Sequence, residues 1–281
     1  MIYLFSSTPE VLEQYFSKKN IDYTLVPKES CSEFLASLDK LDRKDWGISF
    51  NYGKIFPAEL LQKIKIVNVH FSLLPKYRGA VPVEAAVLNG DTVSGITLQW
   101  TSEGLDEGDI IMMRNFDLPV HTPAGDIRSL YIQQLPQMFE DLFKLSENPN
   151  DWESYPQQGE SSYCNKAMLS RENAFLSFGS LTANEIYRRV FAFNPNPYAW
   201  CDVEFNGQKT TMNIMQAEVI GHPTHVAKQL KPGEISWLKG RGMVIGTLLG
   251  YILVTEAIVA GRKVLKNGDI VAMKGNLNII V

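Results

Sequence analysis

The stretch that decides the fold reads Val67-Asn68-Val69-His70-Phe71-Ser72-Leu73-Leu74-Pro75-Lys76-Tyr77-Arg78-Gly79. It begins at the end of an apolar run and finishes in turn-forming residues. Asn68 and His70 stand two positions apart, so a strand would place both side chains on one face. A strand that ends with an amide and an imidazole suits catalysis, or else a satisfied polar pair within a core.

Apolar strands alternate with amphipathic helices on both sides of this stretch. Thr8 is the expected N-cap of the first helix, and Pro9 suits its first position. Pro136 predicts a kink or a break in the longest helix, which Thr122-Pro123 would cap. We expect strands at 2–5, 21–26, 46–50, 95–100 and 110–114, and further helices at 30–41, 58–63 and 80–88. This alternation predicts an α/β fold with a mostly parallel, Rossmann-like sheet and helices on both faces. Sites in such sheets lie at the carboxyl ends of strands.

The pattern changes after about residue 145. Residues 146–180 are rich in Ser, Asn, Gln and Pro and read as a linker with some local structure. A short helix follows at 182–193, and then short apolar runs alternate with turns such as Asn206-Gly207. About five or six strands in this part predict a small OB-like β-barrel. We therefore expect a catalytic domain over 1–178 and an OB-like domain over 179–281.

Composition excludes several classes of protein. The chain has 281 residues, 45% hydrophobic and 21% charged, with a net charge of −4. Residues 175–281 carry 11 Lys and Arg against 7 Asp and Glu, a net charge of +4. This excess weakly favours a nucleic-acid partner, and ordinary surface variation explains it about as well. The three cysteines form no CxxC pair, which argues against a disulfide framework or a zinc site. Without a signal peptide or an apolar run long enough to span a membrane, we expect a cytoplasmic protein.

Three residues could carry chemistry. A lone His in an apolar strand is more often structural, but His70 can exchange a proton near neutral pH. Asn68 is an uncharged donor suited to holding an oxyanion. Asp106 lies in the acidic loop Gly104-Leu105-Asp106-Glu107-Gly108-Asp109. One interpretation of that loop is a metal site, although its spacing does not match a known metal loop, and a second is an acidic surface turn. In a third, the flanking glycines permit an unusual backbone conformation, and Asp106 reaches His70 and orients it. His222 and His225 flank Pro223, which argues against a helical metal site there.

Two motifs together resemble the signature of the 10-formyltetrahydrofolate-dependent formyltransferases. They are the run from Asn68 to Pro82 and the acidic loop from Gly104 to Asp109. The run Phe193-Asn194-Pro195-Asn196-Pro197-Tyr198-Ala199-Trp200 is similar to the hinge before the OB-like domain in the members that act on methionyl-tRNA. The resemblance covers nearly the whole chain.

The resemblance implies a catalytic trio of Asn68, His70 and Asp106. In this chemistry Asn68 and a protonated His70 would stabilise the tetrahedral oxyanion that forms when an amine attacks the formyl carbon. The co-substrate would be 10-formyltetrahydrofolate, with no metal. Its implied binding residues are Ser72, Leu73, Leu74 and Pro75, together with the backbone of Lys54, Ile55 and Phe56.

The acceptor amine is the open question. The Pro-rich hinge and the basic tail favour initiator methionyl-tRNA, bound by a monomeric enzyme during translation initiation. The tRNA-directed members have a long basic loop after the second strand, whereas only residues 27–45 stand there in this chain. The short loop keeps a nucleotide-linked amino sugar as the alternative acceptor. A formyltetrahydrofolate hydrolase would share the trio, and a non-catalytic RNA-binding protein would have no use for all three residues.

Overall fold

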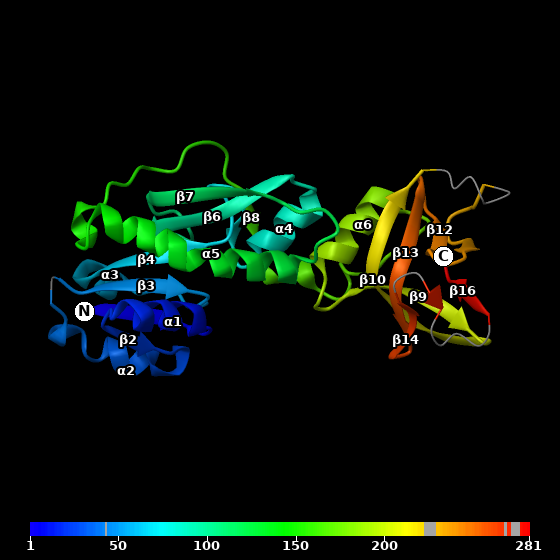
Figure 1. Cartoon of the computed structure of the whole chain (residues 1–281). Helices are drawn as coiled ribbons and strands as arrows, with labels where there is room; N and C mark the ends of the chain where they lie inside the picture. Colours follow the sequence, from blue (N-terminus) through cyan, green and yellow to red (C-terminus); the bar gives the residue numbers. More distant parts are fainter. Residues whose placement is uncertain (43, 222–228, 267–268, 271–275) are drawn as a thin grey trace. The chain divides into compact units, whose positions relative to one another are not determined.

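The computed structural model describes residues 1–42, 44–221, 229–266, 269–270 and 276–281. The chain forms two compact units (Figure 1). The N-terminal unit contains Met1–Val83, Thr92–Asp117 and Arg128–Asn165, and the C-terminal unit contains Glu84–Asp91, Leu118–Ile127 and Lys166–Val281. The pair His222 and His225, and the end of the strand expected over 269–273, lie outside the described residues.

A six-stranded sheet with the order β2-β1-β3-β4-β6-β7 forms the centre of the N-terminal unit. Its first four strands pair in parallel, and β6 and β7 are antiparallel additions at one edge. The strands are β1 (Ile2–Ser6), β2 (Tyr23–Val26), β3 (Trp46–Phe50), β4 (Lys65–His70), β6 (Val93–Trp100) and β7 (Ile110–Asp117). The predicted mixed α/β class with a mostly parallel sheet is confirmed.

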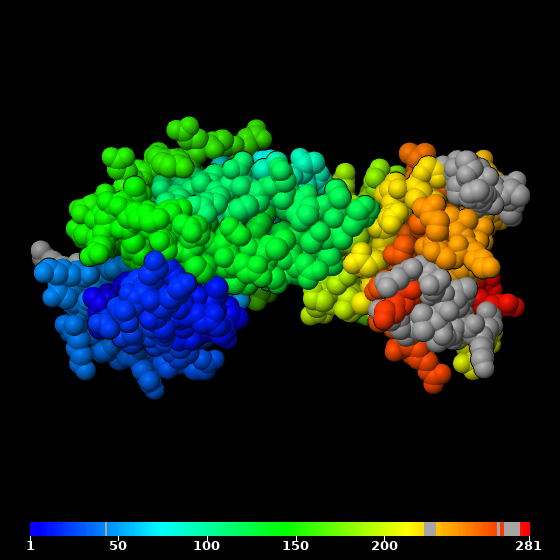
Figure 2. Space-filling model, in the orientation of Figure 1, coloured from blue at the N-terminus to red at the C-terminus, as the bar shows by residue number. Residues whose placement is uncertain are grey.

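Helices cover both faces of this sheet. On one face, α1 (Glu10–Lys19) lies beside α5 (Ala124–Leu145), where Lys19 and Glu140 form an ion pair at 3.0 Å (Figure 2). On the other face, α2 (Cys31–Leu35) and α3 (Ala58–Lys63) pack around the buried Phe5 of β1. A Cβ on Gly47 of β3 would meet Phe5 at 2.7 Å and Ile66 at 3.2 Å, so these side chains share the second face. Because side chains alternate along β4, Asn68 and His70 lie on that face too.

Two local predictions in this unit are wrong. The N-cap of α1 is Pro9, and the Thr8 hydroxyl instead accepts a hydrogen bond from the Asn51 side chain at 3.2 Å. The helix expected over 30–41 breaks into α2 and 3₁₀ turns, because the Ser37 hydroxyl bonds the Phe34 carbonyl and competes with the helix. Of the kink or break predicted at Pro136, the break does not occur, since α5 continues through this residue. Burial of neighbouring α5 side chains offsets the lost backbone hydrogen bond.

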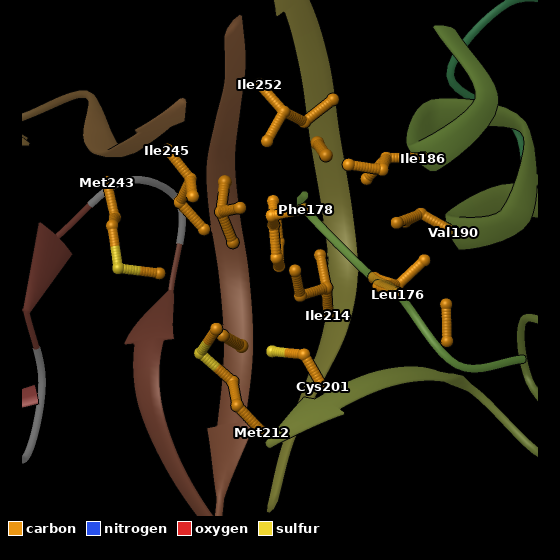
Figure 3. Close-up of a cluster of buried hydrophobic side chains, with 14 of the residues drawn as sticks. Leu176, Phe178, Ile186, Val190, Cys201, Met212, Ile214, Met243, Ile245 and Ile252 are labelled. Atoms are coloured by element: carbon orange, nitrogen blue, oxygen red, sulfur yellow. The ribbon is translucent and has the colours of Figure 1, made fainter. Parts of the chain in front are cut away.

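The C-terminal unit is built on an eight-stranded antiparallel sheet that curls around α6 (Ala183–Ala192). Thr182 and Glu185 form a capping box that starts this helix. Side chains from α6 and from the sheet meet in one core that includes Ile186, Val190 and Ile214 (Figure 3). The strands are β9 (Ala199–Phe205), β10 (Gln208–Ile220), β11 (Ile235–Leu238), β12 (Gly242–Gly246), β13 (Tyr251–Val259), β14 (Arg262–Lys266), β15 (Asp269–Ile270) and β16 (Leu277–Ile279). The count exceeds the five or six expected, because short strands such as β16 give little periodic signal.

The segment over 146–180, expected as a linker with some local structure, contains several short elements. It contains a 3₁₀ turn at Pro149–Asp151, the short strand β8 (Tyr163–Cys164) and a second 3₁₀ turn at Lys166–Leu169. Strand β8 pairs in parallel with β5 (Arg78–Gly79), which is the end of the stretch from Val67 to Gly79. In the described residues no helix is long and apolar enough to cross a membrane.

Candidate active site

Strands β4 and β6 bring four polar side chains onto one face of the sheet. In their antiparallel register Asn68 lies opposite Gln99, and His70 lies opposite Thr97. Opposed residues of an antiparallel pair point to the same side. Three of the four are almost fully buried, with exposed fractions of 5% for His70, 1% for Gln99 and 0% for Thr97. Buried polar groups are costly unless they are hydrogen-bonded, so this patch needs partners.

Asp106 supplies the principal partner. Its Oδ1 accepts hydrogen bonds from the amide of Asn68 at 3.1 Å and from the amide of Gln99 at 3.0 Å. Its Oδ2 accepts from the backbone N–H of Gly79 at 2.7 Å and lies 3.6 Å from Nδ1 of His70. Of the alternatives for the acidic loop, the geometry therefore matches the one in which Asp106 faces His70. Asn68, His70 and Asp106, far apart in sequence, lie together at the end of β4.

The backbone of the Asp106 loop differs from the expectation in one respect. The unusual conformation falls on Asp106 itself, with φ of +52°, a region that Asp enters more readily than most residues. Gly108 has another reason to be glycine. A Cβ there would lie 1.6 Å from the carbonyl oxygen of Trp100, where the loop returns to pair with β6. Gly108 therefore allows a close backbone approach that holds the loop against the sheet.

His70 is fixed by its other nitrogen. Nε2 lies 2.8 Å from the backbone carbonyl of Tyr77, and a carbonyl can only accept a hydrogen bond. Nε2 therefore carries a hydrogen, and in the neutral imidazole Nδ1 holds the lone pair. That nitrogen faces Asp106 at 3.6 Å, beyond ordinary hydrogen-bond length. Nδ1 is thus the ring nitrogen that can exchange a proton.

The loop after β4 is fastened to Thr97. The Thr97 hydroxyl donates to the Ser72 carbonyl at 2.6 Å and accepts from the Leu74 backbone at 3.3 Å. The Ser72 hydroxyl in turn bonds the carbonyl of Lys76 at 2.5 Å. Leu74 and Pro75 are buried, and a Cβ on Gly95 would meet the Leu73 side chain, so Leu73 packs on that strand. These hydrogen bonds hold the loop that is expected to bind folate, and its contact with folate stays a prediction.

The second expected folate segment follows β3. The Lys54 ammonium donates to the Lys28 carbonyl at 2.7 Å, while the Ile55 side chain is 82% exposed. Phe56 is buried, with its ring stacked on Tyr52 at 5.5 Å between centroids. Burial raises the pKa of Tyr52, so its phenol stays neutral. The described contacts of this segment are with Lys28 and Tyr52, and its role in folate binding remains a prediction.

Three residues around the trio escaped the sequence reasoning: Thr97, Gln99 and Gln157. Thr97 and Gln99 were detectable, because both interrupt the apolar pattern of β6 at alternate positions, as Asn68 and His70 do in β4. Gln157 had no such signal in its irregular segment. Its amide contacts the Asp106 and Gly108 carbonyls at 2.8 and 2.9 Å. Within the described residues, no three His, Cys, Asp or Glu side chains are grouped so that they could hold a metal ion.

Comparison with known proteins identifies the family. Residues 7–130 match the model of the formyl transferase family, and residues 168–274 match the model of the formyl transferase C-terminal domain. Methionyl-tRNA formyltransferase of Borreliella burgdorferi is 34% identical over 226 residues, covering 79% of this chain and 69% of the relative. The chain belongs to the formyltransferase family. The resemblance inferred from the two motifs is confirmed.

Other formyltransferases extend the likeness. Methionyl-tRNA formyltransferase of Pelotomaculum thermopropionicum is 33% identical over 268 residues, covering 93% of this chain and 80% of the relative. The solved structure of WlaRD, a sugar 3N-formyl transferase, superposes with a TM-score of 0.65 at 18% identity. That comparison covers 94% of this chain and 97% of WlaRD. At this low identity it supports the formyltransferase fold and nothing finer.

Proposed function

We propose that this formyltransferase moves the formyl group of 10-formyltetrahydrofolate onto the free amine of initiator methionyl-tRNA. The observation that carries the proposal is the convergence of Asn68, His70 and Asp106 at the end of β4, in a chain whose relatives are methionyl-tRNA formyltransferases. Donor, acceptor and proton-transfer groups within a few ångströms are what acyl transfer to an amine needs. The reaction supports translation initiation, and we place it in the cytoplasm.

The folate supplies the formyl group, and the chain's own residues manage charge. As the acceptor amine attacks the formyl carbon, the carbonyl oxygen becomes negative. Asn68 has two amide hydrogens and uses one on Asp106, so the other is free to donate to this oxygen. The expectation of a protonated His70 at this stage is revised in our proposal. Its Nε2 hydrogen already serves the Tyr77 carbonyl, so Asn68 carries the oxyanion.

His70 moves the proton. The attacking amine must lose a proton and the folate nitrogen N10 must gain one before the bond from carbon to N10 breaks. Nδ1 of neutral His70 accepts the first proton and then delivers it to N10, so no net proton is consumed. The imidazolium formed between these steps lies 3.6 Å from the Asp106 carboxylate, which stabilises its charge. Asp106 thus orients the Asn68 amide and stabilises the positive charge of protonated His70.

We further propose the division of labour along the chain. Residues 1–178 would carry catalysis and the folate site, including Ser72 to Pro75 and Lys54 to Phe56. Residues 179–281 would bind the tRNA phosphates through their net charge of +4. We take the working enzyme to be a monomer.

The second candidate acceptor is a nucleotide-linked amino sugar. It is favoured by the short segment at 27–45, where tRNA-directed members carry a long basic loop. Two relatives, at 34% and 33% identity, are methionyl-tRNA formyltransferases, which makes tRNA the first choice.

One assay separates the two acceptors. The purified chain is supplied with 10-formyltetrahydrofolate and, in parallel, with methionyl-tRNA or a nucleotide-linked amino sugar, and the formylated product is measured by mass spectrometry. We expect transfer to methionyl-tRNA only. Transfer to the sugar alone, or no transfer to tRNA at any salt concentration, would reject our first choice.

A further inference from the structure

The segment between the two family matches lies against the candidate site. Residues 155–164, called here the connector, fall after residue 130 and before residue 168, outside both matched ranges. The backbone of Tyr155 exchanges hydrogen bonds with Ile110 at 2.8 and 3.0 Å, next to the Asp106 loop. At its other end, Cys164 pairs with Gly79 in the short parallel ladder of β5 and β8. The connector therefore touches both chain segments that hold the trio.

Gln157 is the centre of this contact. Its Nε2 lies 2.8 Å from the Asp106 carbonyl, 2.9 Å from the Gly108 carbonyl and 3.2 Å from Oε1 of Gln99. Its Oε1 accepts from Nη2 and Nε of Arg78 at 2.8 and 3.2 Å, a forked contact that fixes the plane of the amide. One side chain thus ties together the Asp106 loop, strand β6 and the segment after β4.

These contacts lead to both oxygens of the Asp106 carboxylate. Gln99, which accepts from Gln157, donates to Asp106 Oδ1 at 3.0 Å. Arg78, which donates to Gln157, precedes Gly79, whose N–H donates to Asp106 Oδ2 at 2.7 Å. The orientation of the Asp106 carboxylate therefore depends on Gln99 and on the backbone after Arg78, and Gln157 hydrogen-bonds both residues.

The far end of the connector fixes His70 in the same indirect way. The Ser162 hydroxyl accepts from the Tyr77 backbone N–H at 2.9 Å, and the buried Cys164 thiol lies 3.3 Å from the Tyr77 carbonyl. That carbonyl is the acceptor for Nε2 of His70. Both members of the His70 and Asp106 pair are thus oriented through contacts with residues 155–164.

We propose that Gln157 is a positioning residue of the active site, which sets the Asp106 carboxylate against His70 and Asn68 through Gln99, Arg78 and the loop backbone. The proposal rests on the roles assigned to the trio under the proposed function. It gives the connector, which composition predicts to be part of a linker, a role in positioning the active-site residues. Among the described hydrogen bonds, Gln157 reaches the trio at the Asp106 backbone carbonyl and not at a reacting side chain, so we expect it to act on geometry and not on binding of the folate.

The test compares Gln157→Ala with Gln158→Ala. Gln158 is the exposed neighbour with the same side chain, so the pair isolates the hydrogen bonds of the partly buried Gln157. Because a misplacement of about 1 Å can cost about 100-fold in rate, we expect kcat of Gln157→Ala to fall by ~10- to ~100-fold. We expect KM for the folate to stay within about twofold, since the folate residues are untouched. Gln158→Ala should match the unsubstituted enzyme in both constants.

A second variant guards against loss of folding. Gln157→Glu keeps the length and the oxygen that faces Arg78, but replaces the two N–H donors with an acceptor that faces three carbonyl oxygens. We expect it to melt below the unsubstituted protein because of these repulsive contacts, but to be fully folded at the assay temperature and still lose kcat. Unchanged kcat in both Gln157 variants, with intact melting curves, would overturn the proposal.

A spectroscopic readout makes the test independent of the acceptor. The chain has four histidines, and His70→Asn assigns the His70 signals in ¹⁵N-histidine-labelled protein. We expect the ring-nitrogen chemical shifts of His70 to change in Gln157→Ala and not in Gln158→Ala. If no acceptor is formylated but the His70 signals move, the proposed function fails and the positioning role stands. If formylation occurs normally and the His70 signals do not move, only the positioning role fails.

Discussion

The side-chain amide of Asn68 donates a hydrogen bond to Asp106 Oδ1 across 3.1 Å, although 38 positions separate the two residues in the chain. This bond determines which amide hydrogen remains for a substrate and turns the amide oxygen away from the carboxylate. Asp106 therefore acts on both neighbours, orienting Asn68 by contact and facing His70 with its second oxygen. Disturbing Asp106 should affect oxyanion stabilisation and proton transfer together.

Asp106→Asn should lower the transfer rate by about 10²- to 10⁴-fold, the range that positioned acid–base groups supply. The carboxylate accepts from Asn68, Gln99 and Gly79, and an amide would turn an N–H toward at least one of these donors. A buried mismatch of this kind also costs about 1–3 kcal/mol of unfolding free energy. Steady-state kinetics and urea unfolding measure the two effects. Asp109→Asn, the same change at an exposed position of the loop, is the control and should alter neither.

His70→Ala should reduce formyl transfer by about 10²- to 10⁴-fold while the protein remains folded. The imidazole is the proton carrier in the proposed reaction, and its removal leaves Asn68 in place. Circular dichroism checks the fold, and a discontinuous product assay checks the rate. His121→Ala, at an exposed histidine of the C-terminal unit, should keep full activity. Near-normal turnover of His70→Ala would refute the proton-transfer role.

Gly108→Ala should destabilise the N-terminal unit and displace the Asp106 loop. The added Cβ would lie 1.6 Å from the Trp100 carbonyl oxygen, so the backbone must move, at a cost of about 1–3 kcal/mol or more. Gly221→Ala is the matched control, because a Cβ there meets nothing within 4 Å. Thermal melting of the two variants measures the difference. Equal melting temperatures would mean that the loop is not held as the structure describes.

The three cysteines should be inert in the native protein. Cys31, Cys164 and Cys201 are buried and form no disulfide, and burial, with Asp202 as a smaller cause, raises the pKa of Cys201 above the ordinary 9.0. A thiol whose pKa is raised on folding contributes stability below its unfolded value, and this contribution is lost as the pH rises above about 9. We expect no reaction with dithionitrobenzoate at pH 8 until guanidinium unfolds the chain. Rapid labelling of the folded protein would contradict the buried placement.

Affinity for methionyl-tRNA should fall steeply with salt. Each phosphate that the basic residues of 175–281 neutralise releases counterions, so the logarithm of the binding constant declines linearly with the logarithm of salt concentration. We expect a loss of at least about tenfold between ~50 and ~200 mM salt, measured by filter binding. Reversing charge at Arg262, an exposed position of β14, should reduce the slope if that arginine meets a phosphate. A flat response would count against tRNA as the acceptor.

Residue patterns were sufficient for the parts of the fold with strong periodicity. β3 and α3 match their expected bounds, because buried apolar runs and a Pro57 boundary define them. The helix expected over 30–41 failed because Ser37 competes for the backbone, a local effect that periodicity does not register. The proximity of Asn68 and His70 followed from strand alternation, whereas their distance to Asp106 depends on how β6 folds back beside β4.

Gln157 shows more clearly which site residues cannot be predicted from the sequence pattern. Its neighbours in sequence form no helix or long strand, so nothing local marks it as part of a site. Its partners, Arg78, Gln99 and Asp106, lie between 51 and 79 positions away. Only tertiary structure reveals that a polar side chain in a Pro- and Ser-rich segment closes a hydrogen-bond network.

The pairing of β8 with β5 limits how such enzymes can be recombined. A chimera that joins the first part of this chain to the C-terminal domain of a relative at residue 146 would exchange Gln157 and Ser162 for foreign residues. A crossover placed after Cys164 keeps the native ladder from Arg78 to Gly79 and its hydrogen bonds intact. We therefore expect a chimera to keep its rate only when the sequence taken from the relative begins beyond β8.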